Sequence, residues 1–207
     1  MLLLIQFKAI KQNPSVGMIV FGHNEIDANG VILRSWVPEY DGVLLPQYAF
    51  RLFSSGVNAR MPSILFRRDA YKECGGVNSS FKLTAGDSEL IQRMAIRFPT
   101  RFVPAIISGY RVWEGGLTHK RIATKLWSDE IEIWMGMLDD ELRATDWGRS
   151  RLFRRCIQDE IRLQNISAGL AKLGTISDRW DFLRLKRYPI LARLRTHLRV
   201  LKFMLKR

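Results

Sequence analysis

The chain has 207 residues, of which 47% are hydrophobic and 26% are charged, and it contains 15 glycines, 7 prolines and 2 cysteines. This length and composition suit one globular domain, or a domain with an appended helical region, and exclude collagenous, disulfide-rich and wholly disordered proteins. The cysteines, Cys74 and Cys156, lie far apart and lack the spacing of a metal site. They indicate a reducing compartment, and we expect the protein in the cytoplasm.

The net charge is +13, from 33 basic and 20 acidic residues, and the excess is largest near the C-terminus. Residues 182–207 hold nine basic and no acidic residues, so this block should bind phosphate groups. From residue 190 onward, leucines fall on one side of a helix with Lys and Arg beside them. This basic amphipathic helix either lies on an anionic membrane surface or packs on the helices before it. Nucleic acid is a weaker partner, because aromatic residues are not interleaved with the basic block.

Helix and strand signals alternate over the first part of the chain, which is the order of an α/β protein. Asn13-Pro14 should stop the first helix, and Gly75-Gly76 should stop a later one. We expect helices over 1–12, 48–54, 67–73 and 87–96, and strands over 16–21, 31–36, 62–66 and 101–107.

From about residue 120 the strand signals vanish and helical periodicity runs to the end of the chain. We expect three helices, over 118–143, 149–172 and 178–206. No apolar run reaches the length of about 18 residues that a membrane span requires. The predicted organisation is therefore an α/β domain over 1–119 and a helical region over 120–207.

The stretch Gly86-Asp87-Ser88-Glu89-Leu90 places an acidic residue at the start of a predicted helix. Helix amides stabilise an anion there, and a carboxylate at such an edge can accept a proton from a bound hydroxyl group. The structural alternative is that Asp87 only caps the helix, while Glu89 and Arg93 form an i,i+4 pair. From these residues alone the capping role is the commoner one.

Residues 4–118 resemble the inverting family-2 glycosyltransferases of the GT-A fold. The resemblance rests on the order and spacing of several blocks, which are residues 16–22, 26–30, 61–68, 71–78, 86–90 with Arg93, 102–104 and 110–112. It implies an incomplete GT-A-like, Rossmann-like mixed sheet, followed here by the helical C-terminal region. It also implies transfer of a sugar from a nucleotide-sugar donor to a glycan or lipid-linked acceptor, as in the synthesis of cell-surface polysaccharide.

The resemblance gives roles to particular residues. Asp87 matches the catalytic base that deprotonates the acceptor hydroxyl group. The residues implied in donor and acceptor binding are Arg67, Arg68, Gly75, Gly76, Glu89, Arg111 and Trp113. Each has a plainer explanation: the arginines as solvated surface residues and the glycines as a helix stop. Relatives often carry a histidine where this chain has Trp113, and His119, a weak candidate metal or phosphate ligand, lies nearby in a loop.

Relatives also carry a nucleotide-binding half with an Asp-x-Asp motif that holds Mg²⁺ or Mn²⁺. This chain contains no such triplet, and Asp139-Asp140 falls in a helical region, where we expect a solvated face. We therefore expect an N-terminally truncated enzyme, inactive alone, with an unpaired sheet edge, an exposed apolar face and poor solubility. The alternative is a non-catalytic remnant or a membrane-surface interaction module. If the basic amphipathic helix binds an anionic membrane surface, residues 182–207 would hold the protein on the inner face of the membrane.

Overall fold

The computed structural model describes residues 2–54, 56–82, 85–113, 125–171, 173 and 179. It is an α/β protein that divides into two compact units. One unit holds the sheet, helices α1 to α3 and most of α4; the other holds helices α6 and α7 together with the short segments Ser54–Gly56 and Phe81–Gly86. The boundary predicted between residues 119 and 120 falls outside the described residues.

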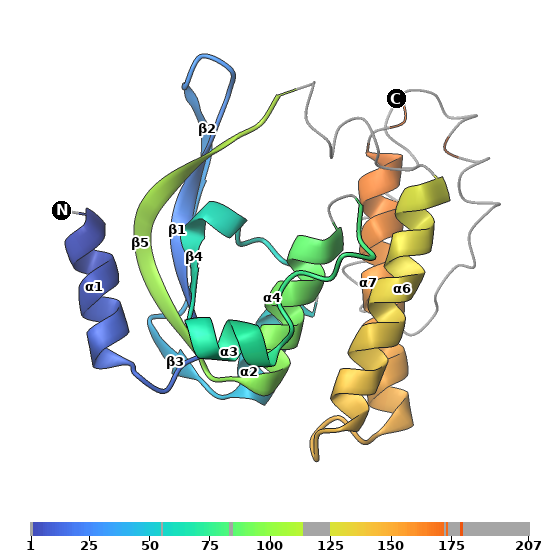
Figure 1. Ribbon diagram of the computed structural model, residues 1–207. Coiled ribbons are helices and arrows are strands. Elements are labelled where there is room, and N and C mark those ends of the chain that lie inside the picture. The colour runs from blue at the N-terminus through green and yellow to red at the C-terminus, as the bar shows by residue number, and fades with distance from the viewer. Residues whose placement is uncertain are drawn as a thin grey trace. The chain divides into compact units, whose positions relative to one another are not determined.

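The first unit is built on a curled, mixed sheet of five strands (Figure 1). The strands are β1 (Met18–Ile26), β2 (Ile32–Trp36), β3 (Gly42–Leu44), β4 (Ile64–Phe66) and β5 (Thr100–Arg111). β1 and β5 run parallel. β4 and β2 pair antiparallel with successive halves of β1, and β3 pairs antiparallel with the start of β5.

The sheet bends where the register between β1 and β5 shifts, on either side of Gly22. Phe21 pairs with Val103 but Gly22 pairs with Ile106, so β5 holds extra residues at this point. Such bulges bend a strand and increase its twist. Pro104, which cannot donate to a ladder, lies within this irregular stretch and is tolerated there.

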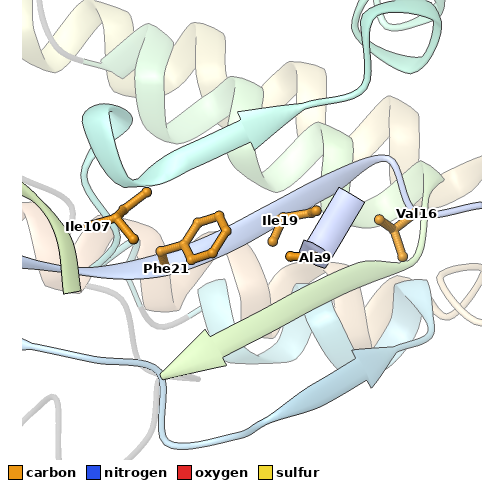
Figure 2. Close-up of a cluster of buried hydrophobic side chains, with 5 residues drawn as sticks. All are labelled: Ala9, Val16, Ile19, Phe21 and Ile107. Carbon is orange, nitrogen blue, oxygen red and sulfur yellow. The ribbon is translucent and has the colours of Figure 1, made fainter. Parts of the chain in front are cut away.

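Helix α1 (Leu2–Gln12) covers one face of the sheet. The apolar residues of β1 alternate between the two faces, and Ile19 and Phe21 meet Ala9 of α1 in a buried cluster. Figure 2 shows the five side chains of this cluster, which are Ala9, Val16, Ile19, Phe21 and Ile107. Burial of β1 on both faces explains why its sequence is a continuous apolar run rather than an alternating one.

The helices between the strands lie on the opposite side of the sheet from α1 in Figure 1. They are α2 (Pro46–Phe53), α3 (Arg68–Glu73) and α4 (Ala85–Arg97), with the 3-10 turn η1 (Met61–Ser63) leading into β4. The Phe53 ring of α2 lies 5.8 Å from that of Phe102 in β5, and Gln92 of α4 donates to the Phe53 carbonyl at 2.8 Å. These contacts join α2 and α4 to the core of the first unit.

In the second unit, α6 (Lys125–Arg143) and α7 (Arg151–Leu170) lie side by side (Figure 1). The hydroxyl group of Ser150 caps α7 by accepting from the Phe153 amide at 3.3 Å. Arg154 of α7 donates to Asp139 of α6 at 2.8 Å and to the carbonyl of Gly148 at 3.0 Å. Because Asp139 is drawn into this pair, the predicted solvated face is wrong for Asp139, while Asp140 is exposed as expected.

The α/β order and the stop of the first helix near Asn13 are confirmed, and several boundaries are corrected. β1 continues five residues and β5 four residues past their predicted ends, because the two strands pair with each other as far as Ile26 and Arg111. β3 was not expected; it is a short strand that, among the described strands, pairs with β5 alone. Helix α4 begins at Ala85, so Asp87 lies inside its first turn rather than at the cap.

Two further predictions concern the C-terminal part. The helices expected over 118–143 and 149–172 correspond to α6 and α7, which are shorter in the described chain. The amphipathic helix predicted over 178–206, with the basic block 182–207, lies outside the described residues. None of the helices in the described part combines the length and the apolar content needed to cross a bilayer.

Candidate functional site

Asp87 lies in the first turn of α4, the helix that precedes β5. In Figure 1 α4 descends toward the start of β5 and β5 returns upward, so the start of α4 faces the end where β1 and β5 finish. In sheets of this kind, ligands bind outside the carboxyl ends of parallel strands. Helix α4 thus begins on the side toward which β1 and β5 run.

The Asp87 side chain is exposed, and within the described residues it has no hydrogen-bonding or charged partner that affects its titration. Partial desolvation by the surrounding protein raises the pKa of its carboxyl group. A raised pKa makes a carboxylate a better proton acceptor, and exposure leaves it within reach of a bound molecule. The Asp87 carboxylate therefore has the two properties that a general base needs.

Glu89, two residues further along α4, lies in a different environment. Its side chain is fully buried, and its oxygens accept from Arg93 Nε at 2.6 Å and from Arg93 Nη2 at 2.9 Å. The i,i+4 pair expected from the sequence is confirmed, but it is buried rather than a surface pair. In the described structure Glu89 binds Arg93 and does not face solvent.

Gly75 and Gly76 form the turn that ends α3, as the helix-stop interpretation predicted. Both have positive φ, +80° and +66°, and the Gly76 amide donates to the Tyr71 carbonyl at 3.0 Å. A Cβ at Gly75 would meet no atom within 4 Å, whereas one at Gly76 would lie 3.0 Å from the Tyr71 ring. Backbone conformation thus accounts for both glycines, and the open space beside Gly75 leaves its backbone approachable.

Arg67 and Arg68 follow β4 and differ in how strongly they are held. Arg67 donates to Asp69 at 3.0 Å and to the Pro14 carbonyl at 3.1 Å, while Arg68 is exposed at the start of α3. Beside them lies a cavity of about 260 Å³, lined mainly by apolar side chains of α1, β1 and β4, including Ile10 and Leu65. Hydrogen bonds therefore hold Arg67 more firmly than Arg68. Both arginines line the edge of this apolar cavity.

Arg111 ends β5 and holds the turn between β1 and β2. Its Nη1 atom donates to the carbonyls of Asp27 at 2.9 Å and of Ala28 at 2.6 Å. Trp113, two residues later, is 57% exposed. His119 and the loop that carries it fall outside the described residues.

A polar cluster on β1 was not anticipated from the sequence. Glu25 accepts from Arg34 Nε at 2.6 Å and from Arg60 Nη2 at 2.9 Å, and the Arg60 guanidinium lies over the Tyr110 ring at 5.0 Å. The hydrogen bond from Arg34 lowers the pKa of Glu25 to about 2; the bond from Arg60 adds to this effect and burial opposes it. Nothing in the sequence indicated this cluster, because residues 24–30 have the composition of a turn and the predicted strand ended at residue 21.

The row beside Glu25 contains His23 and Ser108, which pair across β1 and β5. Burial, and after it Arg60, lowers the pKa of His23, and its ring lies 5.4 Å from that of Trp36. Within the described residues, His23 Nδ1 and Ser108 Oγ are buried without a hydrogen-bond partner. Burial thus favours the neutral form of the His23 ring at this position of the sheet.

The structure brings some predicted site residues together and leaves others apart. Glu89 is linked to the turn of Gly75 and Gly76 through Arg93, and Asp87 lies on the same helix. Arg67 and Arg68 sit at the end of β4, and Arg111 and Trp113 at the end of β5. In the described ranges, no three His, Cys, Asp or Glu side chains gather as metal ligands would.

Comparison of the chain with protein-family models, with curated proteins and with solved structures finds no match.

Proposed function

We propose that this chain is the acceptor-side half of a GT-A-like, family-2-like glycosyltransferase, which moves a sugar from a nucleotide-sugar donor to a hydroxyl acceptor. The observation that carries the proposal is the environment of Asp87. Its carboxylate is exposed in the first turn of α4, and partial desolvation raises its pKa. The resemblance of residues 4–118 assigns the base of the reaction to this same residue.

The reaction is a single displacement. Asp87 accepts the proton of the acceptor hydroxyl group, whose oxygen then attacks the anomeric carbon from the face opposite the leaving diphosphate. The C–O bond to the diphosphate breaks as the new glycosidic bond forms, so the anomeric configuration inverts. Arg68, exposed at the start of α3, is available to offset charge on the diphosphate.

The metal-binding part of such an enzyme is not among these 207 residues, since they contain no Asp-x-Asp triplet. A complementary nucleotide-binding half would therefore come from residues outside them or from a partner chain. The described sheet has room for it, because β4 pairs only with β1 among the described strands. The apolar cavity lies at this edge, and α1 exposes Leu4, Phe7 and Ile10, each at least 50% accessible.

This exposed apolar surface supports a packing interface and leads us to propose poor solubility for the chain alone. A preparation that stays monomeric at high concentration would contradict that part of the proposal. We also propose a cytoplasmic location, on the inner face of the membrane, with contact through the basic block 182–207.

A second candidate is a non-catalytic module that binds the membrane surface. The observation in its favour is the sequence of the basic block, which carries nine positive residues and no acidic one. Such a module needs neither Asp87 nor a nucleotide-binding half. The two candidates therefore differ in whether sugar transfer depends on Asp87.

The test measures release of nucleoside diphosphate from a panel of nucleotide-sugars with Mg²⁺ or Mn²⁺. It uses the product of the complete reading frame, after the DNA upstream of the Met1 codon has been searched for an in-frame Asp-x-Asp motif. We expect release by the wild type and by Asp140→Asn, a control at an exposed carboxylate of α6, and a loss of at least about 100-fold in Asp87→Asn. Absence of release from every donor, or equal release by Asp87→Asn, would refute the proposal.

A further inference from the structure

The ion pair between Glu89 and Arg93 is more deeply buried than helix stability requires. An i,i+4 pair on a helix surface contributes little, and burying both charges adds a desolvation cost. Here the side chains of Glu89 and Arg93 are 0% and 5% accessible. A buried pair of this kind needs further hydrogen bonds to be stable, and those bonds indicate its role.

The other bonds of Arg93 go to the turn after α3. Its Nη1 atom donates to the carbonyl of Cys74, and its Nη2 atom donates to the carbonyl of Gly76 at 2.8 Å. These carbonyls flank Gly75 at the end of a helix, where backbone acceptors lack partners within the helix. One guanidinium group thus joins the glycine turn to α4.

Glu89 determines the orientation of this group. The two carboxylate oxygens of Glu89 accept hydrogen bonds from Arg93 Nε and Nη2. This pairing fixes the plane of the guanidinium group and directs its remaining donors toward the turn. Asp87 lies two residues before Glu89 on the same helix. The position of the glycine turn relative to Asp87 is therefore coupled to one buried pair.

We infer that Arg93, held in place by Glu89, is a positioning residue that sets the turn of Gly75 and Gly76 relative to the helix carrying Asp87. This inference rests on the proposed function for the role of Asp87, whereas the coupling of turn to helix stands on the hydrogen bonds alone. It gives Glu89 the task of orienting Arg93 rather than of touching a sugar. A displacement of about 1 Å between a base and the groups that bind its substrate is enough to slow a reaction strongly.

The variants separate positioning from folding. Arg93→Met alone leaves Glu89 buried and unpaired and can prevent folding, so the main variant is the double substitution Glu89→Leu with Arg93→Met, which buries no charge. Arg93→Lys keeps the charge and loses the fork. Arg97→Met is the matched control, because Arg97 also lies on α4 and donates to the Glu73 carbonyl at 3.2 Å, but is exposed.

The first measurement is amide hydrogen exchange of the full-length variants at Gly75, Gly76 and Val77. We expect exchange about 10-fold faster in the double variant and in Arg93→Lys, with less than about twofold change in Arg97→Met and in strand β1. Unchanged exchange at the turn would overturn the inference whatever the protein catalyses. Equal acceleration in the β1 strand would show general destabilisation and would also overturn it.

The second measurement is the acceptor KM in the transfer assay. We expect the acceptor KM to rise about 10-fold in the double variant, because misplacement of the turn weakens binding. Loss of folded protein alone would lower kcat and leave KM unchanged. Faster turn exchange with an unchanged acceptor KM would overturn the positioning role. If the wild type transfers no sugar, the proposed function fails, and the exchange result decides the coupling separately.

Discussion

The cluster of Glu25, Arg34 and Arg60 gives a quantitative prediction for the substitution Glu25→Gln. A pKa of about 2 in place of the ordinary 4.5 corresponds, at about 1.4 kcal/mol for each pH unit, to at most about 3 kcal/mol of stability. The side chains of Arg34 and Arg60 are 65% and 33% accessible, so solvent screens their interaction with Glu25. We therefore expect Glu25→Gln to lower the free energy of unfolding at pH 7 by about 1–2 kcal/mol.

The sign of the pH dependence follows from the lowered pKa. Glu25 in the folded chain stays ionised at a pH where the unfolded chain binds a proton, so its contribution is complete above the unfolded value of about 4.5. The contribution is lost as the pH falls from there to about 2. The difference between wild type and Glu25→Gln should accordingly shrink over this range and vanish near pH 2.

Two assays test this reasoning. Urea unfolding at several pH values gives the difference in stability, and hydrogen exchange of residues 18–36 should be about 5–30-fold faster in the variant at pH 7. Glu39→Gln is the matched control, because Glu39 is exposed and forms no ion pair within the described residues. A Glu25 pKa near 4.5 by carbon NMR, or a difference that does not change with pH, would refute the argument.

Four further outcomes are expected. Phe21→Ala should lower the free energy of unfolding in urea by about 3–5 kcal/mol, because its ring is fully buried in the cluster against α1. Gly75→Ala should cost about 1 kcal/mol by the same measurement and Gly75→Asn less, since positive φ is the only obstacle there. Arg154→Met should cost about 2 kcal/mol in thermal unfolding, because it leaves two backbone carbonyls without their donor and Asp139 with Arg143 alone. Asp87→Asn should be more stable to urea than the wild type above the Asp87 pKa, with the difference disappearing at lower pH, because a raised pKa means that folding disfavours the ionised form.

The elements whose signals are local could be predicted from the sequence. Asn13 ends α1 by donating from its side chain to the Ala9 carbonyl at 2.8 Å, four residues earlier. Gly75 and Gly76 end α3 because their own backbone angles are favoured by glycine. The apolar run of β1 predicted a buried strand without any knowledge of its partners.

The environment of the candidate site residues could not be predicted from such local signals. The acidic residues of α4 indicated where the candidate site lies. The helical periodicity of the sequence could not show that Asp87 is exposed while Glu89 is buried in an ion pair with Arg93. That difference depends on the carbonyls of Cys74 and Gly76, which lie 19 and 17 residues from Arg93. The predicted N-cap role of Asp87 was wrong because the helix begins two residues before it.

By itself the sequence determined the α/β order, the main helix stops and the buried centre of the sheet, because each depends on interactions among residues a few positions apart. Only the tertiary structure decided that β4 and β2 share one edge of β1, that β3 joins β5, and that Glu25 meets Arg60 from 35 positions away. Strand pairing and ion pairing over such separations depend on how the chain closes its loops. Only the folded chain brings these backbone edges and charges together.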